Sequence, residues 1–269
     1  MAPVDHSLPT QTAVQALTLD RFNVLGVSVS ITNMQNAMDV ADDLIRAGRR
    51  GYICVTGVHG VMESQSDEDL LHTHNESLLT VPDGMPLVWL GKLQGHNNIG
   101  RVYGPDFMIE LSRRAVERQY KVFLYGGAPG VAQDLKLSLE TKCPGLKVVG
   151  THTPPFRPLN EAEELDLIGQ VAECKPDIMW VGLSTPKQER FMAKYLPLLS
   201  CNLLVGVGAA FDIHTGRIAD SPALLKKCGL QWLHRLFQEP KRLWRRYLFN
   251  NPRFLYAVGR QLIGLSRYE

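Results

Sequence analysis

The segment Val81-Pro82-Asp83-Gly84-Met85-Pro86 lies between two apolar runs, Leu78 to Val81 and Leu87 to Leu90. The first run is typical of a short strand and the second of a helix, so the segment predicts a strand-to-helix turn that its prolines stiffen. Backbone N–H groups at the start of a helix stabilise an anion, and such a turn is open to a ligand. Asp83 is therefore a candidate functional carboxylate, and the plainer alternative is that it caps the following helix.

The same alternation of strand and helix continues along the chain. Short β-rich runs are separated by amphipathic segments of about 10–15 residues, which is typical of a parallel sheet with helices on both faces. The expected strands are residues 22–29, as one strand or a small hairpin, 52–56, 78–81, 121–125, 146–150, 177–181 and 202–206. We predict an α/β fold, a Rossmann-like doubly wound and mostly parallel sheet, with ligands at the carboxyl ends of the strands.

Charge is distributed unevenly along the 269 residues. The formal net charge is +2, yet residues 229–269 contain eight Lys or Arg and two acids, so this tail carries +6 and the rest −4. A basic tail on a mildly acidic body predicts an anionic partner, which is a phosphate, a membrane surface or a nucleic acid. Apolar residues recur in the tail at helical spacing, with breaks between helices expected at Pro240 and Pro252.

Composition limits the class of protein further. The five cysteines are widely spaced and form no Cys-x-x-Cys pair, which indicates reduced thiols in a cytosolic protein. No apolar stretch reaches the roughly 18 residues of a membrane span, and the N-terminus lacks a signal-peptide layout. We expect a flexible arm at residues 1–20, a Rossmann-like catalytic domain at 21–228 and a basic amphipathic helical appendage at 229–269.

Several polar or glycine-rich segments follow the expected strands. The Gly126-Gly127 turn between a strand and a helix could cradle a phosphate, although no Walker pattern is present. Gly206-Val-Gly208 resembles half of a dinucleotide fingerprint, but Phe211 takes the place of its third glycine, which argues against an NAD site. Asp67-x-Asp69 could hold a metal, but Ser66 and Asp69 also form an ordinary helix capping box, which we favour.

Five motifs occur in a fixed order between residues 22 and 262. They are Val81-Pro-Asp-Gly-Met-Pro86, Arg101-Val-Tyr-Gly-Pro-Asp106, Gly182-Leu-Ser-Thr-Pro-Lys-Gln-Glu189, Gly206-Val-Gly-Ala-Ala-Phe-Asp212, and Gly229-Leu-Gln-Trp-Leu-His-Arg235 continued through Glu239-Pro-Lys-Arg242-Leu-Trp-Arg-Arg-Tyr247. In this order and spacing they resemble the WecG/TagA/CpsF glycosyltransferases, glycosyltransferase family 26.

The resemblance implies an inverting transfer from a UDP-sugar donor to a polyprenyl-diphosphate-linked sugar. The reaction would take place at the inner, cytoplasmic face of the cell membrane, on an anionic surface that the chain binds peripherally. No metal and no other cofactor is implied. Carried over by position, the catalytic base is Asp83, the active-site threonine is Thr56, the donor-site residues are Arg101 and Gln188, and the appendage arginines are Arg235, Arg242 and Arg245. Lys187 and Glu189, beside Gln188, complete the candidate binding set together with Gly126 and Gly127.

Two departures from the family pattern concern the substrates. Val58 stands where the family often has Asn, and His59 follows it as a second acid/base group, an acceptor contact or a simple loop histidine. Asp220-Ser221-Pro222 replaces the usual Arg-Ala-Pro. The Thr-Gly-Val-His-Gly-Val sequence, together with Pro-Pro-Phe-Arg-Pro, looks like an exopolysaccharide-assembly branch. The transferred sugar, the acceptor and whether the chain forms a homo-oligomer stay open.

Plainer interpretations remain for the other candidates. Thr56 could simply end a strand, Arg101 could form a surface ion pair, and Gln188 could be an ordinary first-turn helix residue. A different class of function is nucleic-acid binding by the tail, where Trp232, Trp244, Phe249 and Phe254 lie among the arginines. The acidic body and the lack of a recognition motif argue against that alternative, so we expect no nucleic-acid partner.

Overall fold

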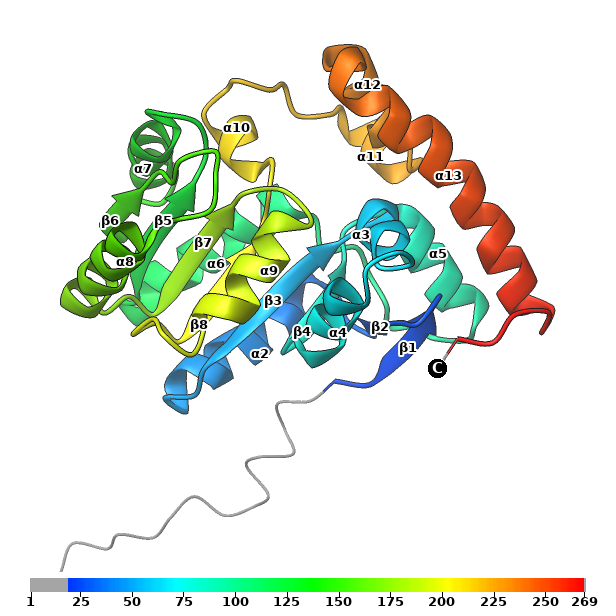
Figure 1. Ribbon diagram of the computed structural model, residues 1–269, viewed down its shortest axis with the longest axis horizontal. Helices are drawn as coiled ribbons and strands as arrows, with labels where there is room; N and C mark the ends of the chain where they lie inside the picture. The colour runs from blue at the N-terminus through cyan, green and yellow to red at the C-terminus, as the bar shows by residue number, and fades with distance from the viewer. Residues whose placement is uncertain (1–18, 269) are drawn as a thin grey trace, which may run out of the picture.

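The computed structural model describes residues 19–268, so the predicted N-terminal arm lies almost entirely outside the described residues. Six parallel strands form one sheet in the order β4-β3-β8-β7-β5-β6, which confirms the predicted α/β fold (Figure 1). The strands are β3 (Gly51–Thr56), β4 (Leu79–Pro82), β5 (Lys121–Gly126), β6 (Lys147–His152), β7 (Ile178–Gly182) and β8 (Leu203–Gly206). Each overlaps a strand that the sequence predicts.

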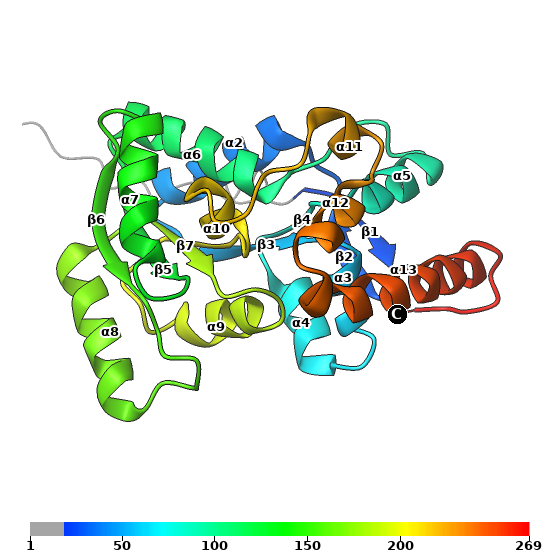
Figure 2. The same cartoon turned by 90° about the horizontal axis from the view of Figure 1, so that it is seen from above.

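Helices cover both faces of this sheet (Figure 2). On one face lie α2 (Met34–Arg46), α6 (Gly104–Arg118) and α7 (Val131–Lys142), and on the other lie α4 (Glu68–Glu76), α8 (Glu161–Cys174) and α9 (Lys187–Tyr195). Successive side chains of a strand point to opposite faces, so Ile53 packs with α2 while Tyr52 and Cys54 pack with α9. Because both faces are buried, the strands are nearly continuous apolar runs.

The carboxyl ends of four neighbouring strands meet at one edge of the sheet. Thr56 lies opposite Pro82, and Gly206 lies opposite both Cys54 and Val181. Consequently the loops after β3, β4, β7 and β8 converge. β3 has β4 on one side and β8 on the other, and ligands of doubly wound sheets bind at such changes of strand order.

A small hairpin packs beside the sheet with a third apolar cluster. Strands β1 (Arg21–Val24) and β2 (Val27–Ser30) pair around Leu25 and Gly26, whose φ angles of 53° and 86° belong to a tight hairpin turn. This confirms the hairpin alternative for residues 22–29. The other elements of the cluster are α3 (Val58–Glu63), α5 (Met85–Leu93) and α13 (Pro240–Leu262). Phe254 and Val258 of α13 are buried in it, so the predicted appendage contributes to a core of the protein.

After β8 the described chain is helical. The helices are α10 (Ala210–His214), α11 (Ala223–Lys227), α12 (Gln231–Gln238) and α13, which runs along one end of the molecule and packs on α3 (Figure 1). The break predicted at Pro252 is wrong, because α13 continues through it. Pro252 and Leu248 are both exposed, so water can bond the Leu248 carbonyl that the proline leaves without an N–H partner.

No helix among residues 19–268 combines the length and the hydrophobicity needed to cross a bilayer.

Candidate active site

Asp83 is fixed at the converging strand ends by two backbone contacts. Its N–H donates to the carbonyl of Thr56 at 2.9 Å, and its Oδ1 accepts from the N–H of Gly104 at 3.2 Å. Gly104 is the first residue of α6, whereas the residue that caps α5 is Gly84, without a side-chain bond. Asp83 therefore does not cap the helix that follows it, as the plainer alternative held, and its carboxylate instead meets the positive start of α6.

The surroundings of Asp83 push its pKa in opposite directions. Burial raises the pKa of this carboxyl above its ordinary value, while Arg101, the Gly104 N–H, Arg235 and Arg246 oppose the rise. The Arg101 guanidinium lies 3.9 Å from Oδ1, and its Nε donates to the Asp83 carbonyl. The side chain stays 35% exposed, because it forms part of a cavity wall. A carboxylate with a raised pKa is a stronger base than one on the surface, which suits proton transfer.

A cavity of about 400 Å³ separates this edge of the sheet from residues 228–230, α12 and α13. A smaller hollow of about 100 Å³ lies next to it and extends toward Ser184, Gln188 and the loop after β8. Asp83 belongs to the walls of both, as do Tyr103, Arg235 and Arg246. Asp83 thus lies where two hollows meet, an arrangement that suits a reaction between two bound molecules.

A buried amide whose oxygen has no partner among the described residues lines the smaller hollow. Gln188 is 2% exposed, and its Oε1 has no partner among residues 19–268. Its Nε2 donates to Glu189 Oε1 at 3.1 Å, and the Thr185 hydroxyl donates to the same oxygen at 2.8 Å. Burial raises the pKa of the Glu189 carboxyl, which is completely covered, whereas Lys187 is exposed. Of the three neighbouring candidates, Gln188 is the one whose side chain reaches the hollow.

Arginines from α12 and α13 close the other side of both hollows. Arg235 and Arg242 each contact Glu239 Oε2, at 2.8 and 2.6 Å. Arg246 was absent from the predicted set, but it lines both hollows, and its buried Nε has no partner in the described part of the chain. Arg245, which was predicted, is exposed and stacks on Trp244 at 5.2 Å. Arg242 and Arg246 share a helix face at a spacing of four residues, the signal that could have identified Arg246.

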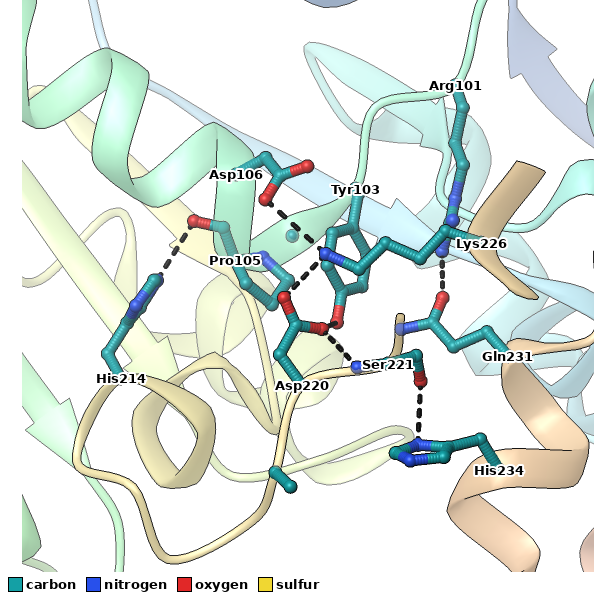
Figure 3. A network of polar contacts seen from close by, with 12 residues as sticks. Arg101, Tyr103, Pro105, Asp106, His214, Asp220, Ser221, Lys226, Gln231 and His234 are labelled. Atoms are coloured by element: carbon teal, nitrogen blue, oxygen red, sulfur yellow. Dashed lines mark hydrogen bonds and ion pairs between the residues drawn. The ribbon is translucent and has the colours of Figure 1, made fainter. Parts of the chain in front are cut away.

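Arg101 belongs to a polar network that ties the α11–α12 region to the carboxyl edge of the sheet (Figure 3). Its guanidinium donates to Gln231 of α12 and lies 4.5 Å from the centre of the Tyr103 ring. The Tyr103 hydroxyl donates to Asp220 Oδ1 at 2.8 Å, and the Lys226 ammonium contacts Asp220 Oδ2 at 2.5 Å. Asp220, at one of the departures from the family pattern, is thus held by Tyr103 and Lys226.

Thr56 lies behind the cavity wall, 2% exposed, with its side chain turned toward α4. His74 Nδ1 lies 3.0 Å from the carbonyl of Leu70, which only accepts, so Nδ1 carries the proton. Nε2 must then accept from the Thr56 hydroxyl, 3.0 Å away. Burial lowers the pKa of His74 to about 4, in agreement with a neutral ring. Thr56 thus fixes the strand end whose carbonyl holds the Asp83 N–H.

His59 lines the larger cavity as a neutral ring. Burial first, then the charge of Arg246, lowers the pKa of His59 to about 3. Its 3.5 Å contact with Glu63 is therefore not an ion pair at neutral pH. Nδ1 lies 3.3 Å from the Asn250 amide nitrogen, which donates to it. His59 consequently links α3 to α13, and such a weakly basic ring is poorly suited to accept a proton near neutral pH.

The Gly126-Gly127 turn lies at the end of β5, outside the walls of the two hollows. The φ angles are +125° and +76°, and a Cβ on Gly126 would lie 2.6 Å from the Gly182 carbonyl oxygen. Close packing of Gly126 against β7 and of Gly127 against Val131 of α7 accounts for these glycines without a ligand.

Two further sequence interpretations concern aspartates and aromatic residues. Asp67 Oδ1 accepts from the N–H of Leu70 at 3.1 Å, so Asp67 caps α4, although Ser66 had been expected to do so. Of the four tail aromatics that the nucleic-acid alternative invoked, Phe254 is buried and Trp232 lines the cavity, whereas Trp244 and Phe249 are exposed.

The chain belongs to the glycosyl transferase WecG/TagA/CpsF family, whose family model matches residues 22–268. This confirms the resemblance drawn from the five motifs. Two curated relatives are both named N-acetylglucosaminyldiphosphoundecaprenol N-acetyl-beta-D-mannosaminyltransferase. The protein from Bacillus spizizenii is 30% identical over 178 residues, 66% of this chain and 66% of that protein. The one from Bacillus subtilis is 27% identical over 193 residues, 71% of this chain and 72% of that protein. The matched part of this chain thus spans about two thirds of each relative.

Proposed function

We propose that this protein is an inverting glycosyltransferase that moves a sugar from a UDP-sugar to a saccharide linked to a polyprenyl diphosphate. The observation that carries this proposal is the position of Asp83, whose carboxylate lies between two hollows beside Arg235 and Arg246. The donor would occupy the smaller, polar hollow at the ends of β7 and β8. The acceptor would occupy the larger cavity, and the two would react at Asp83.

In the proposed reaction Asp83 takes the proton of the acceptor hydroxyl. The hydroxyl oxygen forms a bond to the anomeric carbon while the bond from that carbon to the UDP oxygen breaks, and the electron pair leaves with UDP. Attack from the face opposite UDP inverts the anomeric configuration and needs one base without a covalent intermediate. Burial raises the pKa of Asp83 and makes it more basic, while the neighbouring guanidiniums oppose that rise.

The leaving diphosphate gains negative charge that the tail arginines would stabilise. Arg235, Arg242 and Arg246 all line the smaller hollow. Guanidinium groups bind phosphate oxygens through two parallel hydrogen bonds, and in a site shielded from water such bonds contribute strongly. The unpaired Arg246 Nε and Gln188 Oε1 remain free to bind the donor. We propose that the three guanidiniums neutralise the leaving group, so that the reaction proceeds without added metal, while Gln188 Oε1 accepts from a donor N–H or O–H group.

The acceptor part of the proposal draws on the two relatives, whose names specify a diphosphoundecaprenol-linked acceptor and an N-acetylmannosaminyl group. α12 and α13 present large apolar side chains beside exposed arginines. The apolar residues are Phe237, Trp244, Leu248, Phe249, Leu255, Tyr256 and Leu262. Arg245 stacks on Trp244 and Arg260 lies 5.8 Å from the Tyr256 ring, a combination suited to the headgroup boundary of a bilayer. We propose that the protein lies peripherally on the inner membrane face and serves exopolysaccharide assembly.

A transfer assay with the full chain tests this function. UDP-N-acetylmannosamine, other UDP-sugars and a synthetic N-acetylglucosaminyl prenyl diphosphate would be incubated with the protein, and the products separated chromatographically. We expect one UDP-sugar to extend the acceptor with release of UDP, and the same rate after treatment with EDTA. Absence of transfer from every UDP-sugar would contradict the proposed function, and a strict requirement for added Mg²⁺ or Mn²⁺ would contradict its metal independence.

A further inference from the structure

We propose that the apolar part of the larger cavity binds the first isoprene units of the lipid acceptor, those attached directly to the diphosphate. This inference rests on the proposed function and assigns a subsite to it. The subsite is formed by Trp89 of α5 and by Trp232 and Leu255 of the tail helices. Both the body of the protein, through α5, and the tail helices would therefore contact the lipid.

The wall residues show where the cavity opens. Trp89 and Leu255 line it, yet they remain 49% and 69% exposed, so they stand at its mouth between α5 and α13. The Trp89 ring rests on the chain where the tail begins, since a Cβ on Gly229 would lie 2.6 Å from Trp89 Cη2. Gly229 also has a φ of +68°, which favours glycine. These contacts hold the indole ring at the mouth.

The chemistry of the wall changes from the inner end to the mouth. At the inner end lie Asp83, Arg235 and Arg246, which the cavity shares with the smaller hollow. At the mouth lie Trp89 and Leu255. An acceptor with its sugar hydroxyl at Asp83 and its diphosphate beside Arg101, which lines only the larger cavity, would therefore place its first isoprene units against apolar side chains.

The size of the cavity limits how much of the lipid it can hold. A volume of about 400 Å³ is near the lower end for pockets that enclose a drug-sized ligand. The saccharide, the diphosphate and a short piece of prenyl chain fill such a volume, so the remaining chain has to leave through the mouth. Leu93, one turn after Trp89 on α5, is 71% exposed beside it. The chain can thus pass directly from the cavity into a bilayer that covers α5 and α13.

Binding of farnesyl diphosphate to the full-length protein, without donor or vesicles, tests the subsite by calorimetry against inorganic diphosphate. We expect a Kd about ten-fold or more lower for farnesyl diphosphate, a ratio that corresponds to about 1.4 kcal/mol. Trp89→Ala and Leu255→Ser should each reduce the ratio to about three-fold or less. Phe156→Ala, which removes an 86% exposed aromatic from the loop after β6, should leave the ratio unchanged.

Equal Kd values for the two diphosphates would overturn the subsite, and so would an unchanged ratio in both Trp89→Ala and Leu255→Ser. If Trp89→Ala does not fold, Leu255→Ser decides, because its side chain is largely exposed. A protein that prefers farnesyl diphosphate through these residues but transfers no sugar would refute the proposed function alone. A protein that transfers sugar without this preference would refute only the subsite.

Discussion

Arg246→Met separates what the cavity needs for stability from what it needs for activity. The Arg246 Nε is buried without a partner among the described residues, and burial lowers the pKa of its guanidinium. A buried donor without a partner costs about 1–3 kcal/mol, and an apolar side chain of similar length removes that cost. We therefore expect the melting temperature of the variant to stay the same or to rise.

The same change should impair transfer in two ways. Loss of a charged hydrogen bond to the diphosphate, about 1.5–3 kcal/mol, predicts a kcat/KM lower by roughly 10- to 150-fold. In addition, Arg246 lowers the pKa of Asp83, so its removal lets that pKa rise further. Because protonated Asp83 cannot act as the base, the acidic limb of the kcat/KM profile should move to higher pH.

Transfer to a soluble acceptor would be measured across a pH series for Arg246→Met and for Arg245→Met, together with thermal melts. Arg245 is exposed one position earlier on the same helix, so its variant should stay within about two-fold of wild type. The reasoning would be refuted by wild-type kinetics in Arg246→Met, or by a larger loss in Arg245→Met.

Three further predictions concern stability and the tail. Thr56→Val should lower the free energy of unfolding by about 1–3 kcal/mol, because it leaves His74 Nε2 buried without a donor. Thr56→Ser keeps the hydroxyl and should lose less stability. Equal losses in urea titrations would exclude this bond as the cause. The free energy of unfolding should fall as pH is lowered from about 6.5 toward 4. The pKa values of His59 and His74 are lowered to about 3 and about 4 in the folded protein, so both bind a proton at higher pH in the unfolded chain. A flat profile in which the double His→Gln variant matches wild type would contradict this. Truncation before Gly229 should lower the melting temperature as well as activity, because it uncovers the cluster around Phe254. Phe254→Ala alone should lower the free energy of unfolding by about 3–5 kcal/mol. An unchanged melting temperature in both variants would show that α13 is not part of that core.

The sequence was sufficient for the sheet and for the position of Asp83. Strands buried on both faces are apolar throughout, and Pro82 and Gly84 mark the turn, so local patterns determine both features. Helix continuity through Pro252 could not be predicted, because it depends on Phe254 and Val258 packing into a core built from distant segments. Tertiary burial there outweighs the cost of one lost backbone bond.

Side-chain direction was the other feature that the sequence alone could not supply. Adjacent helix positions differ by about 100° in direction, so motif matching chose Arg245 while α13 turns Arg246 into the cavity. In the same way, alternation along β3 turns Thr56 away from the cavity and toward His74, a residue that no motif indicated. The position of Trp89 at the cavity mouth could not be predicted either, because its ring packs on Gly229, which is distant in sequence.

The most direct test of the central claim is the anomeric configuration of the product formed by wild type and by Asp83→Asn. An α-linked UDP-sugar labelled with ¹³C at the anomeric carbon would be transferred to the prenyl diphosphate acceptor and the product examined by NMR. The account predicts a β-linked product from wild type and a turnover about 10²–10⁴-fold lower in Asp83→Asn, with UDP binding retained. Retention of the α configuration, or near-native turnover in Asp83→Asn, would contradict it.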